Sequence, residues 1–175
     1  MDIKAYIMRA IEIVKLNGDA AKEAAADEQG LVPGILVVAV GGLASGISSL
    51  LFHHSVSAII VSPIVAVVFS FIGVGIVHLL ASLFGGKGDY LSLYRAMSLA
   101  NIVSWARIIP IIGGLAGLWM IPMTVIILER VHELERGKAI AVVAILIGAV
   151  ILLFMLAVLL FGAMLAGLFG MSRMM

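Results

Sequence analysis

The feature that most constrains this chain is the placement of its basic residues between long apolar runs. Nine of the eleven lysines and arginines lie in three clusters, separated by segments with almost no charge. Lysine and arginine resist translocation, so clusters of them tend to stay on the cytoplasmic side of a bilayer. If all three clusters share that side, the chain crosses the bilayer an even number of times between them. The clusters are Lys4, Arg9, Lys15 and Lys22; Lys87 and Arg95; and Arg130, Arg136 and Lys138.

The composition indicates that lipid solvates most of the protein. Hydrophobic residues make up 63% of the 175 residues and charged residues 12%, whereas a soluble domain is nearer half apolar and a quarter charged. The net charge of +1 gives no indication of a nucleic-acid partner. The chain has no cysteine, which excludes disulfides, thiolate metal sites and cysteine nucleophiles. We therefore expect an integral membrane protein.

Residues 1–30 are predicted to form a helical arm outside the apolar runs. Residues 2–16 have an amphipathic pattern with lysines near its edge, which suits a helix lying flat among lipid headgroups. The alternative is that this helix packs on the protein's own cytoplasmic face. Residues 17–19 end it, and an alanine-rich helix over 20–29 follows, with Asp19 as its cap. The apolar arc of the first helix consists of Ile3, Tyr6, Ile7, Ala10, Ile11, Ile13 and Val14.

Residues 31–170 are predicted to form an all-α, polytopic domain that crosses the membrane five times. A hydrocarbon core of about 30 Å needs about 20 apolar residues in a helix. The segment 90–128 is too long for one span, and a single crossing there would place the second and third basic clusters on opposite sides. We therefore expect two short spans joined by a hairpin at Gly113-Gly114. The five spans are about 31–52, 62–84, 97–112, 115–128 and 139–165.

The same charge rule orients the chain. With all three basic clusters in the cytoplasm, the N-terminus is cytoplasmic and the C-terminus lies on the other side. The turn at residues 53–55 carries no lysine or arginine and is expected to face away from the cytoplasm. The segments 85–89 and 129–138 are expected to be cytoplasmic loops.

Several motifs together resemble a known family. They are Gly85-Gly-Lys-Gly-Asp89 followed by Tyr90-xxx-Tyr94-Arg95, the glycine pair 113–114 followed by Trp119, and Glu129-Arg-Val-His132 leading to Arg136-Gly-Lys-Ala139. From residue 5 to 165 the chain resembles the Yip domain, the family of Rab-GTPase-interacting integral membrane proteins, and looks like one of its small prokaryotic members. The resemblance implies five spans, no catalytic residues, and a role in membrane trafficking or membrane shaping among eukaryotic members. For a prokaryotic member it implies the cell membrane.

Two residues within the predicted spans are unusual in lipid. A charged side chain such as Arg107 is rare there and normally faces protein, water or an interface. Either it binds helix-end carbonyls, Asn101, Ser104 or a lipid phosphate, or it extends to the outer headgroups. Either His78 titrates as a proton relay or pH sensor, or it hydrogen-bonds a neighbouring helix. Trp105 lies in the same segment as Asn101 and Arg107 and is a candidate functional residue with them.

Glu129 and His132 are candidates in the last cytoplasmic loop, because an i, i+3 spacing puts a carboxylate and an imidazole on one helix face. Di-iron bundles use two such motifs with further glutamates, and this chain has one. The alternative is a solvated helix end with an ion pair between Glu133 and Arg136. We expect no metal site and no cofactor.

The sequence carries no pattern typical of catalysis. None of the five predicted spans contains an aspartate or glutamate, so the paired carboxylates of intramembrane hydrolysis are missing. The glycines at 85–88 lack the length of a phosphate-binding P-loop. We therefore expect that the protein is not an enzyme.

The function that these observations favour is a membrane scaffold or adaptor of the Yip type, which docks partner proteins or shapes the membrane through its cytoplasmic face. One alternative is a small oligomeric transporter or channel, with Arg107 and His78 lining a path. Another is a pH or metal sensor based on His53, His54 and His132. The expected contacts are the lipid bilayer, a cytoplasmic protein and further copies of the chain, without nucleic acid. The residues expected at the membrane surface or at a partner are Lys4, Arg9, Lys15, Lys87, Arg95, Arg136 and Lys138.

Overall fold

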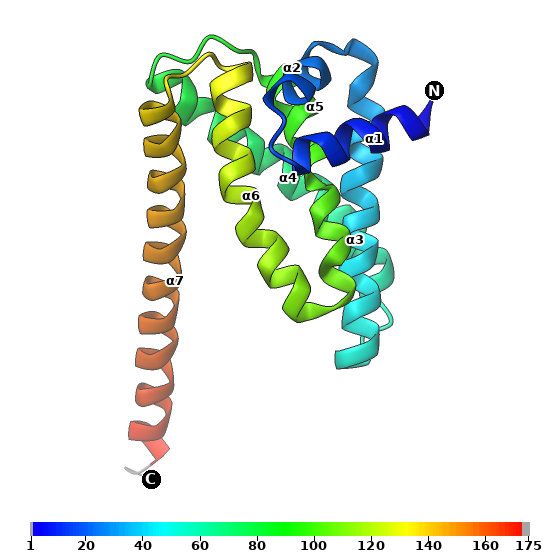
Figure 1. The fold of residues 1–175 in the computed structure, drawn as a ribbon. Coiled ribbons are helices and arrows are strands. Elements are labelled where there is room, and N and C mark those ends of the chain that lie inside the picture. The colour runs from blue at the N-terminus through cyan, green and yellow to red at the C-terminus, as the bar shows by residue number, and fades with distance from the viewer. Residues whose placement is uncertain (1, 173–175) are drawn as a thin grey trace.

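The chain is helical over nearly all of its described length. The computed structural model describes residues 2–172, and side-chain burial over residues 2–162, and it contains no strand in that range. Residues 173–175, which we expect on the non-cytoplasmic side, lie outside it. Figure 1 shows long helices standing side by side, with short helices gathered at one end. The elements are α1 (Ile3–Val14), α2 (Gly18–Ala26), the 3-10 turn η1 (Glu28–Gly30), α3 (Leu31–His53), α4 (Ala58–Leu83), α5 (Tyr90–Ala100), the 3-10 helix η2 (Asn101–Ile108), α6 (Pro110–Val131) and α7 (Arg136–Ser172).

A capped turn separates the two arm helices. Asn17 Oδ1 accepts hydrogen bonds from the backbone N–H groups of Asp19 at 3.0 Å and Ala20 at 3.3 Å. These are donors that the start of a helix leaves free. The second helix therefore begins at Gly18, and the prediction that Asp19 caps it is wrong. It also ends earlier than predicted, at Ala26, and η1 then leads directly into α3.

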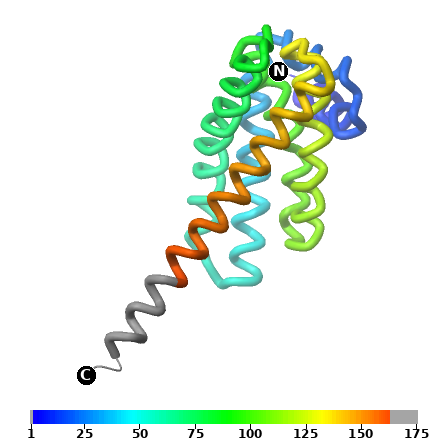
Figure 2. The backbone as a smooth tube through the Cα atoms, turned by 90° about the vertical axis from the view of Figure 1, so that its left-hand side faces the viewer, coloured from blue at the N-terminus to red at the C-terminus, as the bar shows by residue number. Residues whose placement is uncertain are grey.

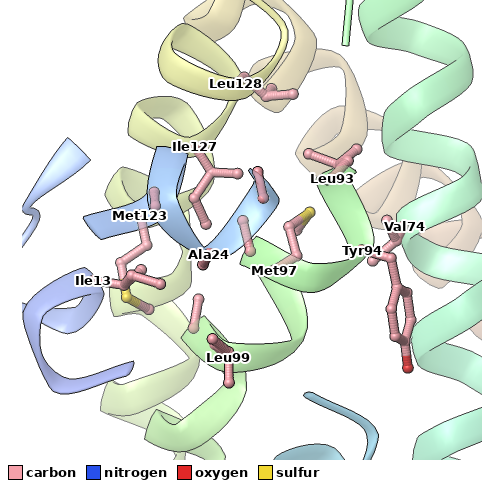
Figure 3. Packing of buried hydrophobic residues seen from close by; sticks show 14 of the residues in the cluster. Ile13, Ala24, Val74, Leu93, Tyr94, Met97, Leu99, Met123, Ile127 and Leu128 are labelled. Carbon is pink, nitrogen blue, oxygen red and sulfur yellow. The ribbon is translucent and has the colours of Figure 1, made fainter. Parts of the chain in front are cut away.

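The arm packs on the protein's own helices, which is one of the two arrangements predicted for α1. Tyr6, Ala10 and Ile13 of α1 are buried. Figure 3 shows Ile13 and Ala24 in the same apolar cluster as Ile127. The small alanine side chains of α2 let its backbone approach α5 and α6 closely, so the arm forms part of the core. The alanines of α2 that are buried there are Ala20, Ala21, Ala24 and Ala25.

Glycines bring α3 and α4 into close contact, since Gly42 and Gly46 lie four residues apart on the side of α3 that faces α4. A Cβ atom on Gly42 would lie 2.5 Å from the Cα atom of Pro63. A Cβ atom on Gly46 would lie 2.5 Å from the carbonyl oxygen of Ala58. Small residues allow such approach where lipid supplies no hydrophobic drive between helices. The α3–α4 pair therefore depends on the absence of side chains at these two positions.

The third and fourth predicted spans are joined at a different place from the predicted hairpin. α5 changes to the 3-10 helix η2 at Asn101, Ile109 is extended with φ −106° and ψ 110°, and Pro110 begins α6. Proline suits the first turn of a helix and favours an extended residue before it. The glycine pair 113–114, predicted as the hairpin, lies inside α6, and Gly113 packs there against Arg107. That prediction is wrong.

Four helices in the described part of the chain are long and apolar enough to cross a membrane. They comprise Glu28–His53, Ala58–Leu83, Pro110–Val131 and Arg136–Gly162. The remaining predicted span corresponds to α5 and η2, which together do not form one long continuous α-helix. The second span begins four residues earlier than predicted, and α7 begins at Arg136 rather than at 139.

Only the first turns of α7 pack closely on the other helices. Ala139, Val142 and Val143 are buried, whereas every side chain from 147 to 162 is exposed. Figure 2 shows the coloured part of α7 inclined to the other helices, and Figure 1 shows it set apart from them. Its 37 residues extend about 55 Å at 1.5 Å per residue. This apolar, exposed helix is the kind of surface that lipid covers.

Candidate functional site

Two connecting segments far apart in the sequence pack together at one end of the helices. We call residues 85–89 the α4–α5 loop and residues 132–135 the α6–α7 turn. The backbone N–H of Lys87 donates a hydrogen bond of 2.9 Å to the carbonyl oxygen of His132. The Lys87 Nζ atom lies 3.5 Å from a carboxylate oxygen of Glu133. The two connections therefore form one structural unit.

A pair of histidines lies beneath this unit. His78 Nδ1 on α4 is 3.4 Å from His132 Nε2, and the ring of Tyr90 meets the His78 ring edge-on at 5.9 Å between centroids. His132 is fully buried. A Cβ atom on Gly86 would lie 2.8 Å from His132 Nδ1, so the loop covers this nitrogen closely. Burial lowers the pKa of His132, as does the nearby His78, while Asp89 opposes the shift.

The histidine pair limits the protonation states that this end of the protein can hold. A hydrogen bond between two imidazoles needs one nitrogen to donate and the other to accept, so at least one of the two rings is neutral. For His78 the sequence left two possibilities, a titrating group or a hydrogen bond to a neighbouring helix. The structure contains such a hydrogen bond, to His132 at the end of α6. The sequence did not indicate the pair, because 54 residues separate its members.

The predicted arrangement of charges in the last loop is wrong. Glu133 has a positive φ of 53° and turns away from Arg136 to pair with Lys87. Arg136 instead lies 3.7 Å from Glu129. Over the described residues, no group of three or more His, Asp or Glu side chains comes together as a metal site would require. Glu129 and His132 therefore face different partners.

Two tyrosines on α5 connect that helix to α4. The Tyr90 hydroxyl donates to the carbonyl oxygen of Phe71 at 3.0 Å, and the Tyr94 hydroxyl lies 2.9 Å from the Ser70 hydroxyl. The rings of Phe71 and Tyr94 stack with centroids 4.1 Å apart. The Tyr90-xxx-Tyr94 spacing, which puts both rings on one helix face, was the available signal for this contact.

A cavity of about 360 Å³ lies between α4, α5, α6 and α7. Asn101 lines it, together with Ser70, Tyr94 and Ser98, while the rest of its wall is apolar. His78 and Arg107 are not among its lining residues. The structure therefore does not bring the predicted channel residues to one path through this cavity.

Arg107 lies at the far end of the helices from the histidine pair. Its side chain lines an open groove between α3 and α4 with Ser45, Ser62 and Phe69. Within the part of the chain that the structure describes, Arg107 forms no ion pair and no side-chain hydrogen bond. Its expected contacts with Asn101 and Ser104 are not present there, and it is exposed. An exposed arginine at a helix end suits extension toward lipid headgroups.

Trp105 lies between the arm and α3. Its Nε1–H donates to the carbonyl oxygen of Val37 at 2.9 Å, which fixes the indole across α3. The ring lines an apolar cavity of about 220 Å³ between α1, α3 and η2. Of the three candidates in this segment, Trp105 is the one whose side chain forms a hydrogen bond within the described residues.

Most of the basic residues predicted at a membrane surface or partner contact groups within the protein. Arg9 lies 2.9 Å from Asp27, and Arg95 donates to the carbonyl oxygen of Ala25 at 3.1 Å. Lys15 Nζ lies 2.7 Å from a carboxylate oxygen of Glu12, one helical turn earlier. Lys87 and Arg136 pair as described above, and Lys4 and Lys138 are exposed. Arg95 therefore connects the arm to α5, and Arg9 joins the two helices of the arm to each other.

The fold described here defines an integral membrane protein built from apolar helices. The Yip1 domain matches residues 13–159 of the chain. The protein belongs to the Yip1 domain family, as the glycine-rich loop and the Glu-Arg-Val-His motif indicated. No curated protein and no solved structure matches it.

Proposed function

We propose that this protein is a non-enzymatic membrane scaffold or adaptor, which docks partner proteins or shapes the membrane through its cytoplasmic face. In this proposal α5 and η2 together form one further crossing, the third of five along the chain. The arm, the α4–α5 loop and the α6–α7 turn then share the cytoplasmic side. The C-terminus then lies on the opposite side. The charge rule for short loops supports this orientation.

The observation that carries the proposal is the convergence of three charged segments at one end of the protein. Arg130 on α6 lies 3.7 Å from Asp19 on α2, and the α4–α5 loop is bonded to the α6–α7 turn through Lys87. Figure 1 shows α2 and these two connections at the same end of the long helices. A surface assembled from rigidly connected segments suits docking better than three independent loops would.

The charges on this surface favour a protein partner over a purely anionic surface. Exposed acids and bases both occur there, and ion pairs within the protein neutralise Lys87, Arg130 and Arg136. Mixed charges fix register and orientation between proteins, whereas attraction to anionic lipid needs a surplus of lysine and arginine. The exposed charged residues of this surface include Asp19, Lys22, Glu28, Lys87, Glu133, Glu135, Arg136 and Lys138.

Site-specific photocrosslinking in intact cells tests the docking surface. A photoreactive residue replaces Lys22 or Glu135, both of which are exposed at the proposed surface. Ser57, exposed in the turn between α3 and α4, is the matched control position at the other end of the helices. We expect a discrete crosslinked protein from positions 22 and 135 but not from 57.

The result that contradicts the docking proposal is equally specific. Crosslinks to lipid alone at positions 22 and 135, in a protein that is folded and inserted, would mean that no partner covers this surface. A charge reversal, Lys22→Glu combined with Lys138→Glu, should reduce the crosslink formed at position 135 several-fold. An unchanged yield would show that these charges do not select the partner.

A further inference from the structure

The outer side of α1 carries apolar residues that the protein does not cover. Ile3, Ile7 and Ile11 recur every four residues and so lie on one side of the helix. Ile3 is 56% exposed and Ile11 43% exposed, although the neighbouring side of α1 is buried through Tyr6, Ala10 and Ile13. One face of α1 therefore contacts the protein, and the next faces outward.

The apolar cavity of about 220 Å³ opens along this side of α1. Its wall consists entirely of apolar and aromatic residues from three elements, and Trp105 is fixed across it by the hydrogen bond to Val37. Leu36 and Val40 belong to this wall and are also 46% and 41% exposed on the surface of α3. Because α3 is an apolar helix of membrane-spanning length, the cavity is continuous with a surface that lipid covers. The wall consists of Ile3, Tyr6, Ile7, Pro33, Leu36, Val37, Val40 and Trp105.

Two exposed charged side chains lie at the start of α1 beside the cavity: Asp2, whose carboxylate caps the helix by accepting from the backbone N–H of Ala5 at 3.2 Å, and Lys4. Lys4 is exposed, follows Ile3 directly and precedes Ile7 by one turn, and it forms no ion pair within the described residues. The other basic residues in and directly after α1 pair internally, Arg9 with Asp27 and Lys15 with Glu12. A lysine stem can lie along apolar surface while its ammonium group reaches the headgroup region. One positive charge thus stands at the edge of an apolar groove.

We propose that this groove binds one acyl chain of an anionic phospholipid from the surrounding leaflet, with Lys4 contacting its phosphate. A volume of about 220 Å³ is below the roughly 300 Å³ of sites for drug-sized molecules, and it suits part of one flexible chain. The bound lipid fills the gap between α1, α3 and η2 and holds the arm against α3. This inference does not depend on a protein partner at the docking surface.

Fluorescence quenching by brominated lipids tests the site in the full-length protein. The chain has two tryptophans, so Trp119→Phe leaves Trp105 in the groove as the sole tryptophan emitter. Because the Trp119 indole N–H donates to the carbonyl oxygen of Val14 on α1 at 2.9 Å, the Trp119→Phe protein must match the natural chain in circular dichroism and gel filtration before it serves as the parent. The protein is reconstituted in bilayers that contain phosphatidylcholine and phosphatidylglycerol, and the bromine is carried on the acyl chains of one lipid at a time. We expect phosphatidylglycerol to quench Trp105 with about fivefold higher relative affinity, the factor that corresponds to about 1 kcal/mol for one lysine near an anionic surface.

Two substitutions separate the groove from the general lipid surface. Lys4→Gln should make the two lipids equally effective, and Val40→Phe should lower quenching by both lipids because its ring occupies the groove. Val68→Phe on α4, half-exposed at 50% and outside the groove, is the matched control and should change neither. If Val40→Phe does not fold as judged by circular dichroism and gel filtration, Leu36→Phe takes its place.

The proposal is overturned by either of two results. One is equal relative affinity of phosphatidylglycerol and phosphatidylcholine for the Trp105 site in the protein that retains Lys4. The other is quenching of Trp105 that is as strong in Val40→Phe or Leu36→Phe as in the control Val68→Phe. In both cases Trp105 meets only the general lipid surface.

Discussion

His132 is a buried histidine whose second ring nitrogen, Nδ1, has no hydrogen-bond partner among the described residues. Its other nitrogen faces His78 at 3.4 Å. The charged groups around the pair come from the α4–α5 loop and the α6–α7 turn: Asp89, Lys87 and Glu133. An additional proton on His132 would place a cation in a buried site beside another imidazole, which is unfavourable.

Protonation of His132 should make stability depend on pH. Its pKa is lowered from an ordinary value of 6.5, so the unfolded chain takes up this proton at higher pH than the folded protein does. Stability is therefore unaffected by this group well above pH 6.5 and is lost as pH falls through 6.5 toward the folded-state pKa. One proton changes the free energy of unfolding by at most about 1.4 kcal/mol per pH unit. The measurement is thermal unfolding in detergent between pH 7.5 and pH 5.

Variants assign this pH dependence to the buried pair. His132→Asn should flatten the loss of stability between pH 7.5 and pH 5, although it is less stable than the parent protein at pH 7.5. His53→Asn, at an exposed residue in the last turn of α3, should leave the slope as it is. A parent slope that persists in His132→Asn would contradict the role of the pair.

α3 and α4 illustrate how a whole element depends on single positions. Their contact requires that Gly42 and Gly46 carry no side chain, because the atoms they face are backbone atoms of α4 that cannot move aside separately. Overpacking of this kind costs about 1–3 kcal/mol. The packing of α3 on α4 thus depends on small residues rather than on a hydrophobic stripe. This is expected in a membrane, because lipid is as apolar as the helix surfaces and gives them no hydrophobic reason to associate.

Gly42→Ala should lower the free energy of unfolding by about 1–3 kcal/mol, since the new Cβ atom would lie 2.5 Å from Pro63 Cα. Gly73→Ala on α4 is the matched control, because a Cβ atom there meets nothing within 4 Å. The control should be neutral or slightly stabilising, as alanine favours helix over glycine. Unfolding of both variants by a denaturing detergent measures the difference, and equal stabilities would contradict the close contact.

The sequence predicted the long elements well and the short ones poorly. α3, α4 and α7 follow from apolar runs bounded by glycine, proline and charge, which are local signals. The turn at Ile109–Pro110 was missed because the glycine pair 113–114 is the stronger breaker by composition, while one extended residue before a proline leaves little trace. The 3-10 conformation of η2 has no distinct pattern either, so its residues could not be told from a transmembrane α-helix.

The candidate site was predictable only where its signals are local. Asn101, Trp105 and Arg107 were selected for their residue types, yet the structure gives each a different place: a cavity wall, an indole fixed across α3 and an exposed groove. The contact between His78 and His132 depends on how distant helices pack, and the charged neighbours of His132 suggested a solvated helix end. Burial by the α4–α5 loop reversed that expectation.

For the whole molecule, the ion pairs explain why basic clusters do not by themselves make a lipid-binding face. Arg9, Arg95 and Arg130 connect the arm to α5 and α6 or close the arm on itself. The basic residues on which the proposed orientation rests thus also hold the first 30 residues in the core. The basic side chains without an ion pair among the described residues include Lys4 beside the apolar groove, Arg107 at the far end of the helices, and Lys22 and Lys138 on the docking surface.

In the proposed orientation, all three basic clusters lie on the cytoplasmic side of the membrane. The most direct test labels single cysteines in intact cells with a reagent that does not cross membranes, which is straightforward because the natural chain has no cysteine. Lys22→Cys, Lys87→Cys and Glu135→Cys should react only after the membrane is permeabilised, whereas Ser57→Cys should react without permeabilisation. Labelling of positions 87 and 135 from opposite sides of the membrane would contradict the account.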